Sequence, residues 1–232
     1  MAFRIQAPFF EIGPKAYMYG DEALALAKAA ERASIDFGIT CIYTPQLTDI
    51  HYIAQNTSKL LICAQKIDPI PVGRGQGSIL PEAVKAAGAH GAMINHVECA
   101  SKLSEVRASI IRAREVGLFS IVCADSIAEA SAVALLNPDI VVAEPSELIG
   151  TGNTSDEEYV LASTRAVKDV NPEIYVLQGA GISNADDVYR VIRAGADATG
   201  SSSAVCKAAD PEKMIREMFA AARQAYDERN AK

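Results

Sequence analysis

The sequence predicts an α/β protein, a single (β/α)8 barrel domain formed by residues 1–232. Short apolar segments alternate along the chain with amphipathic segments of helical periodicity, which is typical of repeated strand–helix units. Most of the apolar segments are hydrophobic throughout, as strands buried on both faces of a parallel sheet are. A chain of 232 residues also has the length of one such barrel.

The expected strands are short apolar segments with flanking glycine, proline or polar residues. The last of them is the least apolar. In chain order they are residues 7–13, 36–43, 60–65, 91–96, 119–124, 139–144, 174–179 and 197–202.

The expected helices show apolar residues at helical spacing and recognisable ends. The segment 21–34 opens on acidic residues, 101–117 ends on a glycine suited to a C-cap, and 211–229 starts with proline in its first turn. The remaining helical segments are residues 126–136, 156–170 and 184–195.

An open, doubly wound sheet is the alternative arrangement of the same units. Such a sheet normally carries a glycine-rich phosphate turn, GxGxxG, after its first strand. The first strand here is followed by "EIGPKAYMYG" (11–20), which lacks that pattern. The closed barrel is therefore favoured, and no linker or low-complexity segment indicates a second domain.

The composition argues against nucleic acid and membranes as partners. The net charge is -7, from 29 acidic and 22 basic residues, and the calculated pI is about 5.1. An acidic protein repels polyanions, although it can bind a small anion through locally arranged amides and a lysine. The N-terminal "MAFRIQAPFF" has no long apolar region of a signal peptide, and we expect a cytoplasmic protein.

The cysteines and histidines predict neither disulfides nor a metal site, and no cofactor is expected. No CxxC occurs, and the histidines lack the spacing of metal ligands, so reduced and mostly buried thiols are expected. The residues concerned are Cys41, Cys63, Cys99, Cys123 and Cys206, with His51, His90 and His96.

In a (β/α)8 barrel, chemistry takes place at the carboxyl ends of the strands. Glu144 ends the sixth expected strand beside Pro145, where burial would raise its pKa towards that of a general base. His96 ends the fourth strand, and a following helix start would favour its neutral form. Lys15 follows the first strand. Taken alone, each could equally be an ordinary structural or solvated side chain.

Small residues follow the last two strands, where barrels commonly bind phosphate through backbone amides. They form "GAGIS" (179–183) and "ATGSSSA" (198–204). Gly150 and Gly152 could bring a further amide to the same anion. The pattern is only moderately specific, because turns are often rich in glycine and serine.

Several segments resemble the triosephosphate isomerase family, in its short archaeal branch. "AEPSELIGTG" is similar to the family's signature segment, "NHVE" to its His-Ser-Glu segment and "GPKAY" to its Asn-x-Lys-x-Tyr segment. "QGAGIS" and "AVCKAADPEK" resemble the same branch. The matches keep the family's order over nearly the whole chain, and the family's fold is the TIM barrel.

The resemblance implies a set of roles. Glu144 would be the base, His96 a neutral electrophile, and Lys15 the cation that holds the substrate and the enediolate. Residues 145–152 would form a lid whose Gly150 N–H reaches the phosphate. Ser183, Ser202 and Ser203 would complete the phosphate site, and Glu98 would lie near Lys15. The implied reaction interconverts D-glyceraldehyde 3-phosphate and dihydroxyacetone phosphate, a step of glycolysis and gluconeogenesis.

Two positions depart from the family pattern. Gly13 stands where the family usually has asparagine, and Val97 stands where it usually has serine. The loss of an amide beside the substrate oxygens puts the substrate in question. Another short ketose phosphate, such as a tetrulose phosphate, is therefore an alternative substrate, and a non-catalytic phosphate-binding barrel is a second alternative.

The segment after the third expected strand (65–83) is longer than an ordinary strand–helix loop. By the resemblance, this loop packs into a neighbouring subunit beside that subunit's lysine. The expected assembly is a homodimer or homotetramer formed through residues 65–80.

Overall fold

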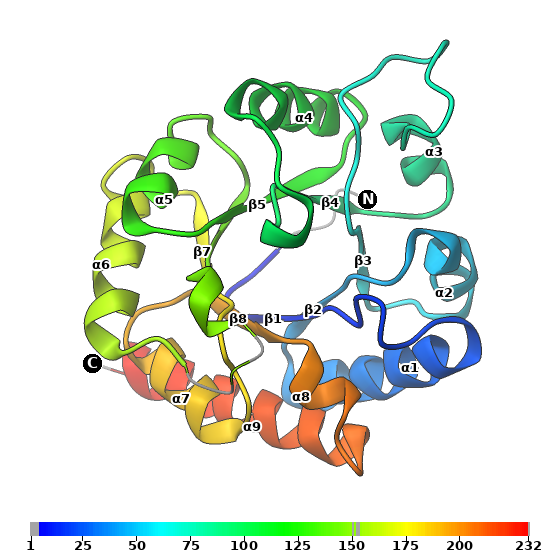
Figure 1. The fold of residues 1–232 in the computed structure, drawn as a ribbon. Coiled ribbons are helices and arrows are strands. Elements are labelled where there is room, and N and C mark those ends of the chain that lie inside the picture. Colours follow the sequence, from blue (N-terminus) through cyan, green and yellow to red (C-terminus); the bar gives the residue numbers. More distant parts are fainter. Residues whose placement is uncertain (1–4, 150, 152–153, 232) are drawn as a thin grey trace.

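The computed structural model describes residues 5–149, 151 and 154–231, and this part of the chain forms a closed barrel of parallel strands in the order β1 to β8. Each strand pairs with the next strand in sequence, and β8 returns to pair with β1. Figure 1 shows the helices on the outside of the ring of strands. The predicted fold class is confirmed.

Each predicted strand segment contains one observed strand, usually shorter than predicted. The strands are β1 (Phe9–Ile12), β2 (Thr40–Tyr43), β3 (Leu61–Ala64), β4 (Gly91–Ile94), β5 (Phe119–Ala124), β6 (Ile140–Ala143), β7 (Tyr175–Gln178) and β8 (Ala198–Ser201). The segment predicted as a strand at 36–43 begins inside a helix, because α1 continues to Phe37 and ends at Gly38 with φ 62°.

The helices include all the predicted ones and some short ones that were not predicted. They are α1 (Gly20–Phe37), α2 (Ile50–Asn56), α3 (Pro81–Ala86), α4 (Leu103–Glu115), α5 (Ile127–Ala134), α6 (Glu157–Lys168), α7 (Ala185–Arg193), α8 (Ser203–Cys206) and α9 (Pro211–Asn230). Single 3-10 turns are η1 (Leu47–Asp49), η2 (Val97–Cys99) and η3 (Ser146–Leu148).

Successive residues of a strand point to opposite sides, which divides the core into two layers. In β1, Phe9 points inside the barrel, among side chains such as Ile42 and Leu177. Phe10 points outwards and packs against Phe219 of α9, with ring centroids 5.0 Å apart. Glu11 shares the inward face with Phe9 and stands one layer nearer the carboxyl end of the barrel.

The five cysteines are free, and three of them, Cys41, Cys63 and Cys123, are buried. None of the helices in the described ranges is both long enough and apolar enough to cross a membrane. Within the same ranges, no three His, Cys, Asp or Glu side chains are grouped as metal ligands.

Candidate active site

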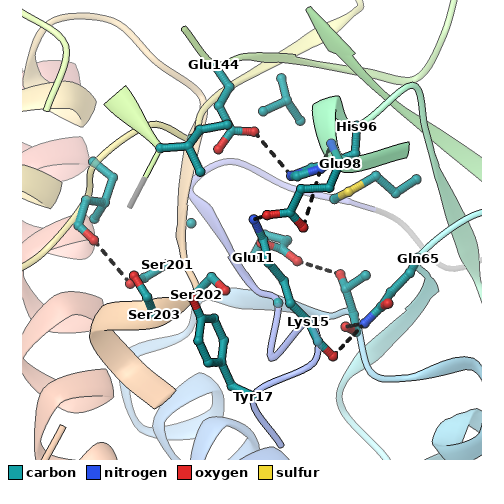
Figure 2. Close-up of a pocket in the computed structure, with 18 of the residues that line it drawn as sticks. Glu11, Lys15, Tyr17, Gln65, His96, Glu98, Glu144, Ser201, Ser202 and Ser203 are labelled. Carbon is teal, nitrogen blue, oxygen red and sulfur yellow. Dashed lines mark hydrogen bonds and ion pairs between the residues drawn. The ribbon is translucent and has the colours of Figure 1, made fainter. Parts of the chain in front are cut away.

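A cavity of about 410 Å³ opens at the carboxyl ends of the strands. Its walls come from the ends of β1, β4, β6, β7 and β8 and from the loops that follow them. The predicted residues Lys15, His96, Glu144, Ser202 and Ser203 all line it. Figure 2 shows them converging from different strands on one space.

Glu144 directly follows β6, and its backbone N–H donates a hydrogen bond to the carbonyl of Ala124 at 3.0 Å. This bond continues the strand pairing and directs the side chain into the cavity, where 14% of it is exposed. Burial raises the pKa of the carboxyl, opposed by the positive charge of Lys15. A carboxylate with a raised pKa is a stronger base than one in water.

His96 faces Glu144 across the cavity, with Nε2 3.7 Å from Oε2 of the carboxylate. Its Nδ1 accepts a hydrogen bond from the backbone N–H of Glu98 at 3.1 Å. A nitrogen that accepts carries no proton, so in the neutral ring the proton is on Nε2. Burial lowers the pKa of the imidazole, and the charge of Lys15 lowers it further. The ring therefore presents a neutral N–H donor to the cavity.

Lys15 adopts a left-handed backbone conformation with φ 48°. Its carbonyl accepts hydrogen bonds from Nε2 of Gln46 at 2.6 Å and Nε2 of Gln65 at 3.1 Å, which hold this conformation. Its ammonium lies 3.0 Å from Oε1 of Glu98. The structure thus brings Lys15 and Glu98 together, as the resemblance implied.

Three of the expected phosphate residues, Ser183, Ser202 and Ser203, belong to the described part of the chain and line the cavity. Ser202 and Ser203 stand where β8 passes into α8, and the buried Ser202 hydroxyl has no hydrogen-bond partner among the described residues. Ser183 also lines the cavity, but both its hydroxyl and its backbone N–H donate to Asp187, at 2.7 and 3.0 Å. Gly150 and Gly152 lie outside the described residues.

The start of the segment after Glu144 is hydrogen-bonded to the loop that follows β5. The backbone N–H of Ser146 donates to Oδ1 of Asp125 at 2.5 Å, and its hydroxyl donates to Oδ2 at 3.1 Å. Ile149 lines the cavity. The described part of the expected lid therefore borders the space beside Glu144.

Glu11 is the cavity residue that sequence reasoning missed. It lines the cavity floor, and its Oε1 accepts a hydrogen bond from the buried hydroxyl of Thr44 at 2.5 Å. The signal was available, because a lone carboxylate in "FFEI" shares the inward face with Phe9. The segment 7–13 was predicted as an apolar strand, and Glu11 was not among the candidate site residues.

The buried carboxylate of Glu144 faces the neutral imidazole of His96, and the ammonium of Lys15 lines the same cavity. This arrangement is typical of a barrel enzyme that transfers protons. The family model described as "Triosephosphate isomerase" matches residues 11–218. A triosephosphate isomerase from Sulfurisphaera tokodaii is 37% identical, with 96% of this chain and 99% of that protein covered. The one from Methanocaldococcus jannaschii is 41% identical, with 86% and 92% covered. The chain belongs to the triosephosphate isomerase family, and it is an isomerase.

Proposed function

We propose that the protein interconverts D-glyceraldehyde 3-phosphate and dihydroxyacetone phosphate through an enediolate. The observation that carries this proposal is the pair formed by Glu144 and His96, two groups of opposite proton-transfer character that face each other at 3.7 Å. Isomerisation needs a base for a carbon-bound proton and an acid for the adjacent carbonyl, and the pair supplies both.

The proposed steps follow from these positions. Glu144 takes the proton from the carbon next to the carbonyl, while the Nε2–H of His96 donates to the carbonyl oxygen. The charge that develops on the two oxygens is stabilised by the ammonium of Lys15. Nε2 of His96 then takes the proton of the original hydroxyl oxygen, in exchange for the proton given to the former carbonyl oxygen. Glu144 returns its proton to the neighbouring carbon, which converts ketose into aldose with no net change in protons.

The phosphate would bind on the wall opposite Glu144. The unpartnered hydroxyl of Ser202 and the amides at the start of α8, including that of Ser203, supply donors there. Ser183 would join them only after its hydroxyl leaves Asp187. Gly150, at the end of the lid, would add its N–H when the lid closes over the substrate.

A tetrulose phosphate is the second candidate substrate, and Gly13 is the observation that favours it. A glycine lines the cavity beside Glu11 where the family usually carries an amide side chain. The missing side chain removes a hydrogen-bond donor, which alters which substrate oxygens can be satisfied.

The first experiment compares turnover of triose and tetrulose phosphates by the wild type, Glu144→Gln and the remote, exposed control Glu173→Gln. Glu144→Gln should lower turnover by several orders of magnitude while an enediolate-mimicking phosphoglycolohydroxamate still binds, because the anion site lies elsewhere. The control should match the wild type. A Glu144→Gln enzyme within tenfold of wild type would falsify the assignment of the base.

We also propose that the protein works in the cytoplasm as a homodimer or homotetramer assembled through residues 65–80. Val72, near the middle of this loop, is 71% exposed. Tyr17, which lines the cavity, and Val97, which follows His96, are each 47% exposed. A partner subunit packed on this loop would cover such side chains. The five free thiols suit a reducing compartment. Light scattering on Val72→Glu should show monomers if this loop forms the interface.

A further inference from the structure

Glu11 is a titratable group in the cavity that the proposed mechanism does not use. It belongs to β1, where it pairs with Ile42 of β2 on one side and Gly200 of β8 on the other. The layer below it, which includes Phe9 and Ile42, is apolar. A carboxyl here is desolvated, and such a position is costly unless the group is hydrogen-bonded or neutral.

The surroundings are shaped to admit this carboxyl. A Cβ on Gly13 would lie 2.9 Å from Oε1 of Glu11, and a Cβ on Gly200 would lie 3.0 Å from Oε2. The carboxyl therefore fills the room that the two glycines leave, including the start of the missing side chain at position 13. Oε1 is occupied by the Thr44 hydroxyl at 2.5 Å. Oε2 has no hydrogen-bond partner within the described ranges.

The charges around Glu11 determine its protonation state. Burial raises its pKa to about 7; the Thr44 hydrogen bond opposes this rise, Glu144 adds to it, and Lys15 opposes it. The other titratable groups that interact with Glu11 are thiols and one phenol, whose own pKa values burial raises, so they stay neutral. They are Cys41, Cys63, Cys123, Cys206 and Tyr43.

We propose that Glu11 is a substrate-contacting residue that acts as a neutral carboxylic acid, with its Oε2–H donating a hydrogen bond to a substrate oxygen at the cavity floor. It replaces the amide donor that Gly13 lacks. The inference rests on the proposed function, because Glu144 must be ionised to act as the base. A second carboxylate in the same cavity would repel both Glu144 and the enediolate, whereas a carboxylic acid stabilises the enediolate.

The test measures binding of the phosphoglycolohydroxamate by calorimetry between about pH 5.5 and about pH 8.5, on either side of the Glu11 titration. The proteins are the wild type, Glu11→Gln, Glu11→Met and the control Glu173→Gln. Glutamine keeps a donor that never ionises, and methionine keeps the length without a donor. Titration of Glu144 and His96 affects all four proteins, so the ratios of their affinities isolate Glu11.

At the acidic end, Glu11→Gln should bind as the wild type does, and Glu11→Met about tenfold more weakly, the effect of one hydrogen bond. At the alkaline end, Glu11→Gln should bind about tenfold more tightly than the wild type, which has lost its donor. A Gln-to-wild-type ratio that does not change with pH overturns the proposal, as does weaker binding by Glu11→Gln at every pH.

Infrared difference spectra of the wild type provide a readout that needs no folded variant. Binding of the hydroxamate at the acidic end should perturb a protonated carboxyl band, and the absence of that band overturns the proposal. The binding data also separate the two claims. If the wild type turns over triose phosphates but the ratio of Glu11→Gln affinity to wild-type affinity is the same at every pH, only the proposed role of Glu11 is wrong. If that ratio changes with pH but triose phosphates are not turned over, only the proposed reaction is wrong.

Discussion

The backbone of Lys15 provides a sharp test of how the site is held in place. Its left-handed conformation, with φ 48°, disfavours a side chain with a Cβ by roughly 1–2 kcal/mol. Two amide donors, Gln46 at 2.6 Å and Gln65 at 3.1 Å, bond its carbonyl in this conformation. Each neutral hydrogen bond contributes about 1 kcal/mol, so the two together roughly balance the strain.

Removing one donor should therefore let Lys15 leave the active conformation. We expect Gln65→Ala to lower kcat/KM up to about fivefold, and Gln46→Ala with Gln65→Ala up to about thirtyfold, because about 1 and about 2 kcal/mol are lost. Affinity for the phosphoglycolohydroxamate should fall in parallel, since in the proposed mechanism the Lys15 ammonium contacts ligand and enediolate alike.

The matched control removes a hydrogen bond to another residue that has a left-handed backbone but lies outside the cavity. Asn137 has φ 57°, and its carbonyl accepts a hydrogen bond from Arg114 at 2.8 Å. Arg114→Ala should lower the free energy of unfolding and leave kcat/KM unchanged. If the Gln65 variants lose as much stability as Arg114→Ala but keep kcat/KM within about twofold of the wild type, the hydrogen bonds from Gln46 and Gln65 to Lys15 have no catalytic role.

Three further changes test other parts of the structure. Gly91→Ala should lower the melting temperature by several degrees, because the new Cβ would lie 2.2 Å from the Phe119 ring and overpacking costs roughly 1–3 kcal/mol. The pKa of Glu11 rises from 4.5 to about 7 on folding, so wild-type stability should fall as pH rises across that interval. The Glu11 contribution, about 2.5 steps of about 1.36 kcal/mol, is roughly 3 kcal/mol, and urea titrations should show a loss smaller by about this amount in Glu11→Gln than in the wild type. Deleting residues 146–149 should lower isomerisation by orders of magnitude and increase the release of inorganic phosphate, measured by phosphate assay; slow turnover without extra phosphate contradicts a protecting lid.

The strands and the approximate positions of the longer helices could be predicted because they depend on local pattern. A buried parallel strand is continuously apolar, and Gly117 and Pro211 mark helix ends by their own backbone preferences. The helices α2 and α3 were missed because seven and six residues are too few for a periodic pattern. The end of α1 was misplaced because Phe37 is apolar in a helix and in a strand alike.

Candidate site residues could be predicted where they end an apolar strand. They could not be predicted where their position depends on contacts between residues far apart in the sequence. Glu144 and His96 follow apolar strands, and barrel geometry brings those ends together. The proposed role of Glu11 depends on Gly13 and Gly200, the latter distant in sequence but paired with Glu11 where β1 meets β8. The bonds from Ser183 to Asp187 likewise arise from a loop geometry that sequence pattern does not specify.

The placement of the carboxyls explains how one lysine can serve the whole site. The Lys15–Glu98 pair is 3.0 Å long, but the Glu98 side chain is 59% exposed, and ion pairs of this kind contribute only about 0–1 kcal/mol. An incoming phosphorylated substrate can therefore take Lys15 from Glu98 at little cost. Glu144 is more deeply placed, with 14% of its side chain exposed, and burial raises its pKa. In the proposed mechanism, this exchange of partners by Lys15 brings positive charge to the substrate while Glu144 keeps the basicity that burial provides.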